Sequence, residues 1–455
     1  LICNLDQFQT SRADDQRRRK RVLEVSRSGL IRIQICKPRG ALSLEISSQQ
    51  ALHMDKQTLK LAAAATLGAA VGAAAALRYA RRPRGDGDRD VEEDHALCRE
   101  RVSAAIAGAM TASQLYVGDK LNLYERMDWL CSTAYSATPN DLAWATGLKP
   151  RWCREWMAQQ AAAGFLICLD GHGKGEGDDE LRFRLPRACA DVLSDPSHAE
   201  YDVGLVQMVP ALVERARRTL PDAFRTGRGV PYDDVDITEA IDRAHQRHIR
   251  DVLLPSVIPK LGDSVLAKLR EGCRVADLGC GGGNLVLALA KAFPRSYVVG
   301  FEVSPAALEV ASAQLEAAGL ANASVVDARA TPLGVAGPFD VVTTYDVLHD
   351  APHPAKLVDE VAAGLATGGV WLLGDVACLD GIRENVASNP SAAKLYGVSA
   401  CLCMACGLSE PGGAGLGTLG FTEKVARDML LGRGIFSSLR VLHEQEGMRW
   451  FEALR

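Results

Sequence analysis

The segment VADLGCGGGN, residues 275–284, constrains the fold more than any other part of the sequence. A hydrophobic run ends in an acid, Asp277, and alternating glycines follow at Gly279, Gly281 and Gly283. A buried strand that leads into a glycine-rich turn and then a helix is typical of nucleotide-binding α/β sheets. We therefore predict a ligand-binding turn where this strand ends.

Strands and helices alternate regularly from about residue 250 to the end of the chain. This alternation predicts an α/β fold with a doubly wound, mostly parallel sheet of seven strands. Because the last two strands form a hairpin, we expect one antiparallel strand, at the edge of the sheet. The expected strands are CRVADLG (273–279), SYVVGFE (296–302), ASVVDA (323–328), FDVVTTYDVLHD (339–350), VWLLGDV (370–376) and two within IFSSLRVLHEQEGMRWFEALR (435–455).

Residues further along the chain distinguish between the candidate nucleotides. The GxGxG pattern lacks the third glycine spacing of a dinucleotide site, and the GK[ST] of a phosphate-binding loop is absent. Asp277 can accept hydrogen bonds from an amino-acid ammonium group. Glu302, which ends the second strand, suits both hydroxyls of a ribose, and Asp327, which ends the third, suits an adenine amino group.

DLGCGGGN, the Glu302 strand end and the step from Asp327 to Ala328 resemble the class I S-adenosylmethionine-dependent methyltransferases. Four further segments are similar to a mainly microbial family of these enzymes that has an N-terminal winged helix. They are YDVLHDAPHPAKLVDEV, GGVWLLGDV, ENVASNP and FRTGRGVPY. The resemblance covers about residues 96–455. It implies a Rossmann-like fold, methyl transfer to a small molecule, and S-adenosyl-L-methionine as cofactor. The cofactor-binding residues that it implies are Asp277, Gly279, Cys280, Gly281, Gly283, Glu302, Val303, Asp327, Ala328 and Tyr345.

The segment YDVLHD, residues 345–350, lies where the fourth strand ends, at the carboxyl edge where ligands bind in open α/β sheets. It resembles the LHD segment of small-molecule O-methyltransferases, in which the histidine is a general base. Carried over, His349 would take a proton from a hydroxyl or phenol; a structural His349 would cap a helix or bond to backbone. Tyr345 and Asp346 complete the catalytic candidates, and Asp375 is a weaker one.

S-methylation is an alternative, because a thioether sulfur has no proton to lose and requires no base. The site would instead hold a cationic sulfonium product, for which Tyr345 and Asp346 are suitable. The acceptor would then be a small methylthio acid, as in a pathway to dimethylsulfoniopropionate. O-methylation is the first prediction. The glycine-rich segment 410–420 is expected to cap the acceptor.

Residues 96–200 are predicted to form a winged-helix α+β domain. SATPNDLAWATGL (136–148) has a helix start signal and a turn at Gly147, and a second helix, a strand, a loop and another strand follow. The loop carries Glu176, Asp178, Asp179 and Glu180, which oppose nucleic-acid binding and hence a winged-helix regulator that senses S-adenosylmethionine. We predict a homodimerisation and substrate-lid domain, joined through a helical connector (201–249) to the methyltransferase domain (250–455).

The N-terminal 95 residues lie outside this resemblance. Residues 1–53 are expected to be disordered, either as the remainder of a truncated start or as translated sequence upstream of Met54. The uncharged run at 61–77 predicts a membrane anchor, a targeting segment or an alanine-rich helix, and an acidic linker follows within 54–95. Localisation would then be at a membrane or in an organelle.

The cysteines indicate the redox environment of the protein, and the net charge indicates which classes of partner it can bind. The 13 cysteines show no paired spacing, which indicates a reducing compartment rather than a disulfide framework. Cys401, Cys403 and Cys406 lie close together without a fourth ligand, so we expect buried thiols and no metal. A net charge of −4 offers no general basis for binding nucleic acid or anionic lipid.

Overall fold

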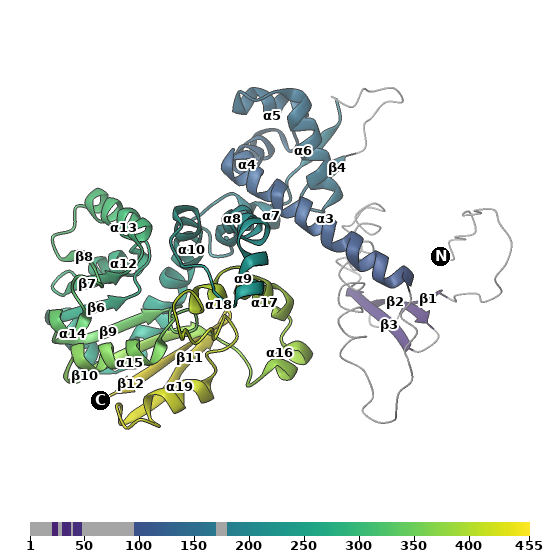
Figure 1. The fold of residues 1–455 in the computed structure, drawn as a ribbon. Coiled ribbons are helices and arrows are strands. Elements are labelled where there is room, and N and C mark those ends of the chain that lie inside the picture. The colour runs from purple at the N-terminus through teal and green to yellow at the C-terminus, as the bar shows by residue number, and fades with distance from the viewer. Residues whose placement is uncertain (1–20, 26–29, 38–39, 48–94, 170–179) are drawn as a thin grey trace, which may run out of the picture. The chain divides into compact units, whose positions relative to one another are not determined.

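The computed structural model describes residues 21–25, 30–37, 40–47, 95–169 and 180–455 (Figure 1). The chain divides into two compact units, Leu1–Arg84 and Gly85–Arg455. The predicted anchor at 61–77, the acidic linker and the acidic loop residues 176–179 lie outside the described residues, so membrane tethering and localisation stay predictions. In the ranges that are described, no helix is long and apolar enough to cross a membrane.

Three strands in the first unit differ from the disorder that we expected for residues 1–53. β1 (Arg21–Val25), β2 (Leu30–Lys37) and β3 (Gly40–Ser47) form an antiparallel sheet with β2 in the middle. The reason is local. LIRIQICK in β2 alternates apolar and polar residues, which is the period of a strand rather than of a helix.

The second unit contains the predicted seven-stranded, mostly parallel sheet. β6, β7, β8, β9 and β10 pair in parallel, whereas β12 is antiparallel to both of its neighbours. In spatial order the strands are β11 (Ser438–Gln445), β12 (Met448–Leu454), β10 (Leu365–Val376), β9 (Phe339–Tyr345), β6 (Arg274–Leu278), β7 (Tyr297–Glu302) and β8 (Ala323–Asp327).

The prediction that the antiparallel strand lies at the edge is wrong. β12 is inserted between β10 and β11, and β11 is the edge strand. The side chains explain this order, because Trp450 and Phe451 of β12 are fully buried and pack into different hydrophobic clusters, one on each face of the sheet. A strand with both faces buried belongs inside a sheet.

Helices cover both faces of the sheet (Figure 1). One face packs against η1 (Ile249–Val257), η2 (Ile258–Leu261), α11 (Asp263–Glu271) and α12 (Asn284–Ala292), with α13 (Pro305–Ala318) beside β8. The other face packs against α14 (Leu333–Ala336), α15 (Pro354–Gly364) and α19 (Glu423–Leu430). The short helices α16 (Ile382–Ser388), α17 (Ala392–Cys401) and α18 (Cys403–Gly407) connect β10 to α19.

The helical region before the sheet has its own hydrophobic core. Its first part comprises α3 (His95–Lys120), α4 (Leu123–Ala134), α5 (Pro139–Thr146), α6 (Pro150–Ala162), the β4–β5 hairpin (Ile167–Leu169 and Arg182–Arg184) and α7 (Arg187–Leu193). α5 starts at a capping box between Thr138 and Asp141 and ends at Gly147, as its sequence indicated. The predicted order of helices and strands is present, while its roles in dimerisation and substrate enclosure stay predictions.

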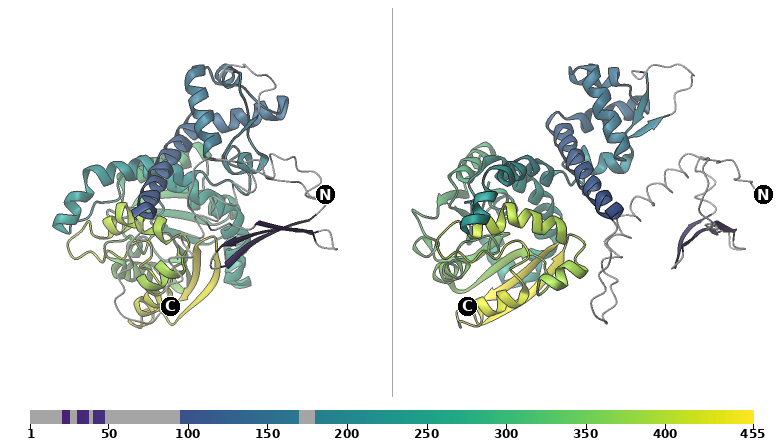
Figure 2. Two further views of the ribbon diagram at one scale, coloured as in Figure 1. Left: turned by 90° about the vertical axis from the view of Figure 1, so that its right-hand side faces the viewer. Right: turned by 45° about the vertical axis from the view of Figure 1, so that its right-hand side comes forward.

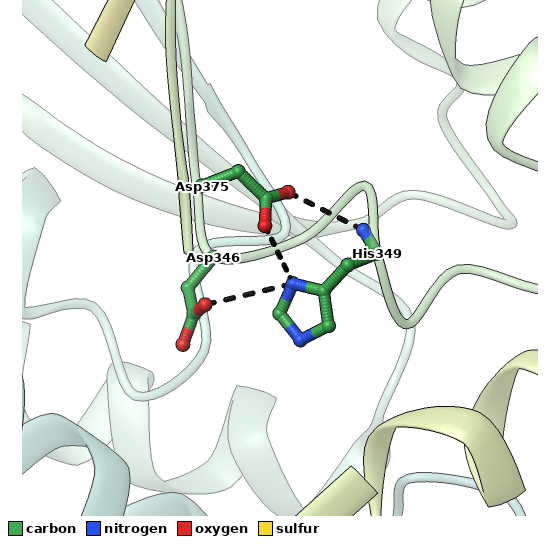
Figure 3. Close-up of side chains that lie close together, drawn as sticks. All are labelled: Asp346, His349 and Asp375. Atoms are coloured by element: carbon green, nitrogen blue, oxygen red, sulfur yellow. Dashed lines mark hydrogen bonds and ion pairs between the residues drawn. The ribbon is translucent and has the colours of Figure 1, made fainter. Parts of the chain in front are cut away.

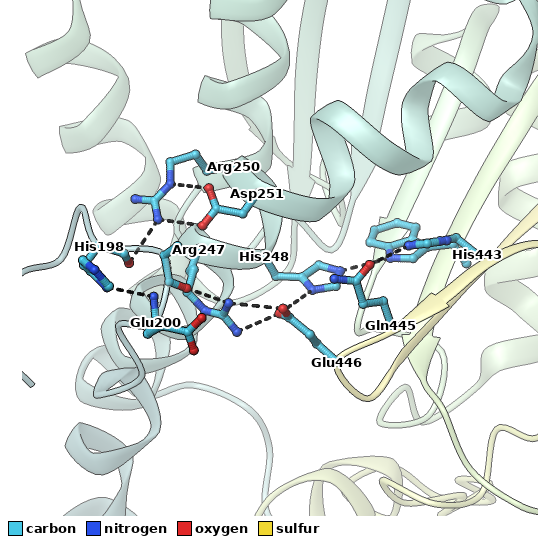
Figure 4. Close-up of polar contacts among 11 residues, drawn as sticks. His198, Glu200, Arg247, His248, Arg250, Asp251, His443, Gln445 and Glu446 are labelled. Carbon is cyan, nitrogen blue, oxygen red and sulfur yellow. Dashed lines mark hydrogen bonds and ion pairs between the residues drawn. The ribbon is translucent and has the colours of Figure 1, made fainter. Parts of the chain in front are cut away.

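Three further helices lie between that region and the sheet (Figures 1 and 2). They are α8 (Gly204–Arg218), α9 (Leu220–Thr226) and α10 (Val235–His248). An ion-pair network joins α10 to the β11–β12 turn (Figure 4). Arg247 Nη2 and Nη1 lie 2.7 and 3.2 Å from the two carboxylate oxygens of Glu446, and Nη1 also donates to the carbonyl of Ala199 at 2.9 Å. Arg247 therefore links α10 to the β11–β12 turn and to the segment that contains Ala199.

We expect Arg247→Met to lower the free energy of unfolding by about 1–2 kcal/mol, because it removes a half-buried, two-pronged ion pair and a bond to backbone. Urea titration followed by circular dichroism measures the change. The matched control is Arg217→Met, whose pair with Glu214 is exposed and lies within α8. There we expect no measurable change. Equal losses of unfolding free energy in the two variants would show that the Arg247 network does not stabilise the fold more than an exposed ion pair does.

Candidate active site

The glycine turn is formed where β6 ends and α12 begins. Gly279, Gly281 and Gly283 have φ angles of 76°, 54° and 90°, in the left-handed region. At Gly279 a Cβ atom would lie 2.6 Å from Cγ2 of Val347, so the turn also requires a missing side chain. Val347 belongs to the YDVLHD segment, and this close approach brings the glycine turn against the catalytic candidates.

Glu302 is held beside this turn by backbone donors. It ends β7 and is only 7% exposed. Oε2 accepts from the N–H of Gly281 at 2.9 Å, and Oε1 accepts from Val303 at 2.7 Å and Ser304 at 2.8 Å. Burial raises the pKa of the carboxyl and the backbone donors oppose this. Oε1 is saturated, so Oε2 is the oxygen with capacity for a ligand hydroxyl.

Asp277 and an acid that we did not predict, Asp242, face the same turn. Asp277 is buried and accepts from Thr343 Oγ1 at 2.7 Å; burial, together with neighbouring carboxylates, raises its pKa to about 7. Asp242 in α10 lies so close to Gly282 that a Cβ there would be 1.9 Å from Oδ2. Burial raises its pKa to about 6. The only sequence signal was its spacing of one helical turn from buried Thr238.

The other predicted cofactor residues lie around these acids. Asp327 ends β8, but its carboxylate accepts from Nε and Nη2 of Arg329, both at 3.0 Å, and these bonds lower its pKa. Ala328 donates its N–H to the carbonyl of Glu302 at 2.9 Å. Cys280 is buried in the turn, and Val303 is exposed after β7. Asp327 is thus paired with Arg329 within the chain, and its role at an adenine amino group stays a prediction.

His349 lies in a buried cluster with Asp346 and Asp375 (Figure 3). His349 is 2% exposed and Asp375 1%. The Nδ1 atom of His349 is 2.8 Å from Oδ1 of Asp375 and 3.6 Å from Oδ1 of Asp346, and its backbone N–H donates to Oδ2 of Asp375 at 3.3 Å. Nε2 points away from both carboxylates (Figure 3). Asp375, the weaker candidate, is therefore the residue that orients the imidazole.

The pKa shifts in this cluster favour the charged forms of His349 and Asp346. Burial alone would lower the pKa of His349, but the carboxylate of Asp375 and the thiol of Cys403 raise it well above the ordinary value. For Asp346, burial would raise the pKa, while the hydrogen bond from His245 and the charge of His349 lower it to about 2. These two shifts favour the ionised form of Asp346 and the protonated form of His349.

Tyr345 and His245 form the wall beside this cluster. His245, from α10, stacks on Tyr345 with ring centres 4.2 Å apart, and its Nε2 is 3.2 Å from Oδ2 of Asp346. Trp450 packs at 5.0 Å on the same tyrosine. The hydroxyl of Tyr345 and Oδ1 of Asp346 are buried without a hydrogen-bond partner among the described residues. We did not predict His245, because it belongs to a connector far away in the sequence.

Possible metal ligands and one of the three clustered cysteines lie near His349. Within the described ranges, the only group of three or more possible metal ligands is Asp346, His349 and Asp375. Cys401, Cys403 and Cys406 are not part of such a group there, and Cys403 and Cys406 are buried. These three cysteines lie on α17 and α18, where Cys403 contacts His349 instead.

The domain matches known proteins. Residues 269–453 match the family model described as a methyltransferase domain. The ubiquinone biosynthesis O-methyltransferase of Psychrobacter arcticus is 35% identical over 108 residues, which are 23% of this chain and 41% of that protein. The chain thus spans about two fifths of the length of the curated relatives that it matches.

Two solved structures resemble most of the chain. Human N-acetylserotonin methyltransferase in complex with SAM has a TM-score of 0.56 at 17% identity and covers 81% of this chain and 99% of its own. An O-methyltransferase family protein from Burkholderia thailandensis has a TM-score of 0.55 at 16% identity, with coverages of 80% and 98%. At these identities the likeness shows a shared fold. Residues 269–453 therefore match a methyltransferase family model, and the described chain shares the fold of these solved structures.

Proposed function

We propose that the chain transfers a methyl group from S-adenosylmethionine to the hydroxyl of a small molecule, with His349 as the general base. The observation that carries this proposal is the buried pair of His349 and Asp375 at the carboxyl edge of the sheet. Asp375 orients the imidazole with Nε2 turned away from the carboxylates, and we assign the acceptor's proton to that nitrogen.

The acids around the glycine turn support S-adenosylmethionine as the cofactor. When bound, this molecule supplies an electrophilic methyl group on a sulfonium. Asp277, Glu302 and Asp242 are crowded together in a buried site, and burial with mutual repulsion raises the pKa of Asp277 and Asp242. A ligand ammonium group would relieve that repulsion. Asp277 would accept from the ammonium and Oε2 of Glu302 from a ribose hydroxyl; Asp327 would serve adenine only if Arg329 moved aside.

His349 must lose its Nε2 proton before it can act as a base. Its raised pKa means that the basic form is gained only as pH rises through a value above the ordinary histidine range. We expect kcat to rise with pH to a plateau. Asp375→Asn should lower the apparent pKa of this limb, because it removes the stabilising charge, and should reduce the plateau about 10²-fold by misorienting the imidazole. A pH profile of kcat for both proteins tests this; an unmoved limb would contradict it.

S-methylation is the second candidate, and one observation favours it. Tyr345 lies among His245, His248 and Trp450, next to the ionised Asp346 with its unpartnered oxygen. Aromatic faces and a carboxylate would hold a sulfonium product. Labelled S-adenosylmethionine, the full chain and a panel of phenols, hydroxy acids and methylthio acids separate the candidates. Transfer to a methylthio acid that survives His349→Ala would support S-methylation.

We also propose that the chain forms a homodimer through its N-terminal helices. Trp144 of α5 and Trp152 of α6 are 78% and 74% exposed. On α3, Val102, Ile106 and Met110 are exposed as well, at the spacing of one helical face. Large exposed apolar side chains are a feature of subunit interfaces.

A further inference from the structure

We infer that the methyl acceptor carries a carboxylate and that Arg215 binds it; this inference rests on the proposed function. Arg215 lies in the last turn of α8 and is 8% exposed. Its Nη2 donates to the carbonyl of Pro231 at 3.2 Å. Its Nη1 is buried without a hydrogen-bond partner, and no ion pair joins Arg215 to a carboxylate in the described part of the chain.

A buried, unpaired guanidinium is costly. Arginine stays protonated in proteins, so the charge cannot be avoided by releasing a proton. Buried charges are therefore normally paired, and buried donors normally have acceptors. A ligand carboxylate would satisfy both needs at once, since it accepts from Nη1 and neutralises the charge.

The position of Arg215 connects it to the catalytic cluster. α8, which carries Arg215, packs against α17, and the charge of Arg215 opposes the burial that raises the pKa of the Cys401 and Cys406 thiols. Cys403, between those two cysteines, pairs with His349. The loop that carries Pro231 is bound to α18, because the N–H of Val230 donates to the carbonyl of Ala405 at 2.9 Å.

A second unpartnered group lies in the segment that contacts the loop of His349. The Oγ1 atom of Thr418 is buried without a hydrogen-bond partner. The preceding residue, Gly417, donates its N–H to the carbonyl of His349 at 2.9 Å, so the segment 410–420 touches the catalytic loop as a cap would. Thr418 itself is tied to α17, since its N–H donates to Oγ of Ser399 at 3.1 Å. Thr418 therefore offers a second unsatisfied hydroxyl beside the loop that carries His349.

The surrounding charges favour a singly charged anion. Asp346 lies 3.6 Å from Nδ1 of His349, and Asp350 is the next residue of the loop, so two carboxylates flank this histidine. One arginine with a single unpartnered nitrogen offers little to a dianionic phosphate among these acids. A carboxylate matches the available donors better.

The test compares salicylate, lactate and methylthioacetate with their primary amides, using the full chain. We expect kcat/KM for the acid that is methylated to exceed that for its amide about 10²-fold, because a charge-assisted bond to a buried guanidinium is lost. Arg215→Met should reduce kcat/KM for the acid by a similar factor, mainly through KM, and abolish the preference over the amide. Arg215→Lys should retain part of it. Affinity for S-adenosylhomocysteine, measured by calorimetry, should not change if these variants are folded.

The control variant is Arg218→Met, three residues further along the same helix, where the guanidinium is exposed and pairs with Glu214. It should keep the preference for acids. Calorimetric titration of each acid and amide into the complex with S-adenosylhomocysteine measures recognition without turnover. Binding of acids alone, with no methyl transfer, would overturn the proposed function and support Arg215. Equal binding and transfer of acids and amides, or a preference that survives Arg215→Met, would overturn the role of Arg215 and leave the function standing.

Discussion

His349→Ala is expected to lower kcat for a hydroxyl acceptor by about 10²–10⁴-fold. The acceptor proton would lose the buried nitrogen that Asp375 orients, and water cannot replace a base at a position that is 2% exposed. The contacts of the glycine turn do not involve His349, so affinity for S-adenosylmethionine should stay within a few-fold of wild type. Single-turnover transfer from labelled cofactor measures the rate, and calorimetry measures the affinity.

The matched control is His353→Ala, four residues further along the same loop. His353 is half-buried and pairs with Glu410 at 3.2 Å, away from the buried carboxylates. We expect nearly full activity there. Nearly full transfer to a hydroxyl in His349→Ala would rule out the general-base role. Tight cofactor binding by the wild-type chain with no transfer to any acceptor would instead support a sensor.

The sequence predicted the parts of this molecule that depend on neighbouring residues. The strand pattern, the left-handed glycine turn and the acids at the strand ends all follow from local periodicity and from where parallel strands end. His349 could be named because its segment directly follows β9. Asp375 was less evident, since only the parallel pairing of β9 with β10 brings it to His349.

The residues that were missed come from the helical connector. Asp242 and His245 lie on α10, and Arg215 lies on α8, all before the first strand of the large sheet. Nothing in an amphipathic helix specifies which sheet edge its polar side chains will reach, because that depends on packing between distant segments. The location of β12 inside the sheet has the same origin. Packing between distant segments thus adds residues from the connector to a site whose central residues follow directly from the strand ends.

Glu302→Ala is expected to weaken binding of S-adenosylmethionine about 10²-fold or more. Two effects act together. The ligand loses the free capacity of Oε2, and the N–H groups of Gly281, Val303 and Ser304 lose their common acceptor, at 2.9, 2.7 and 2.8 Å. Each buried donor left without a partner costs about 1–3 kcal/mol, part of which bound ligand or water recovers. Calorimetry with S-adenosylmethionine and S-adenosylhomocysteine measures the loss.

Glu302→Gln separates these two effects. The amide keeps the shape and one carbonyl oxygen, so it can still accept from Val303 and Ser304, but its NH₂ would face the N–H of Gly281. We expect an intermediate affinity if Oε2 is the atom that meets the ligand. Glu316→Ala, on the exposed side of α13, is the control and should bind as wild type does. Unchanged affinity in Glu302→Ala would mean that the carboxylate neither contacts the ligand nor shapes the turn, and the cofactor site would have to lie elsewhere on the sheet edge.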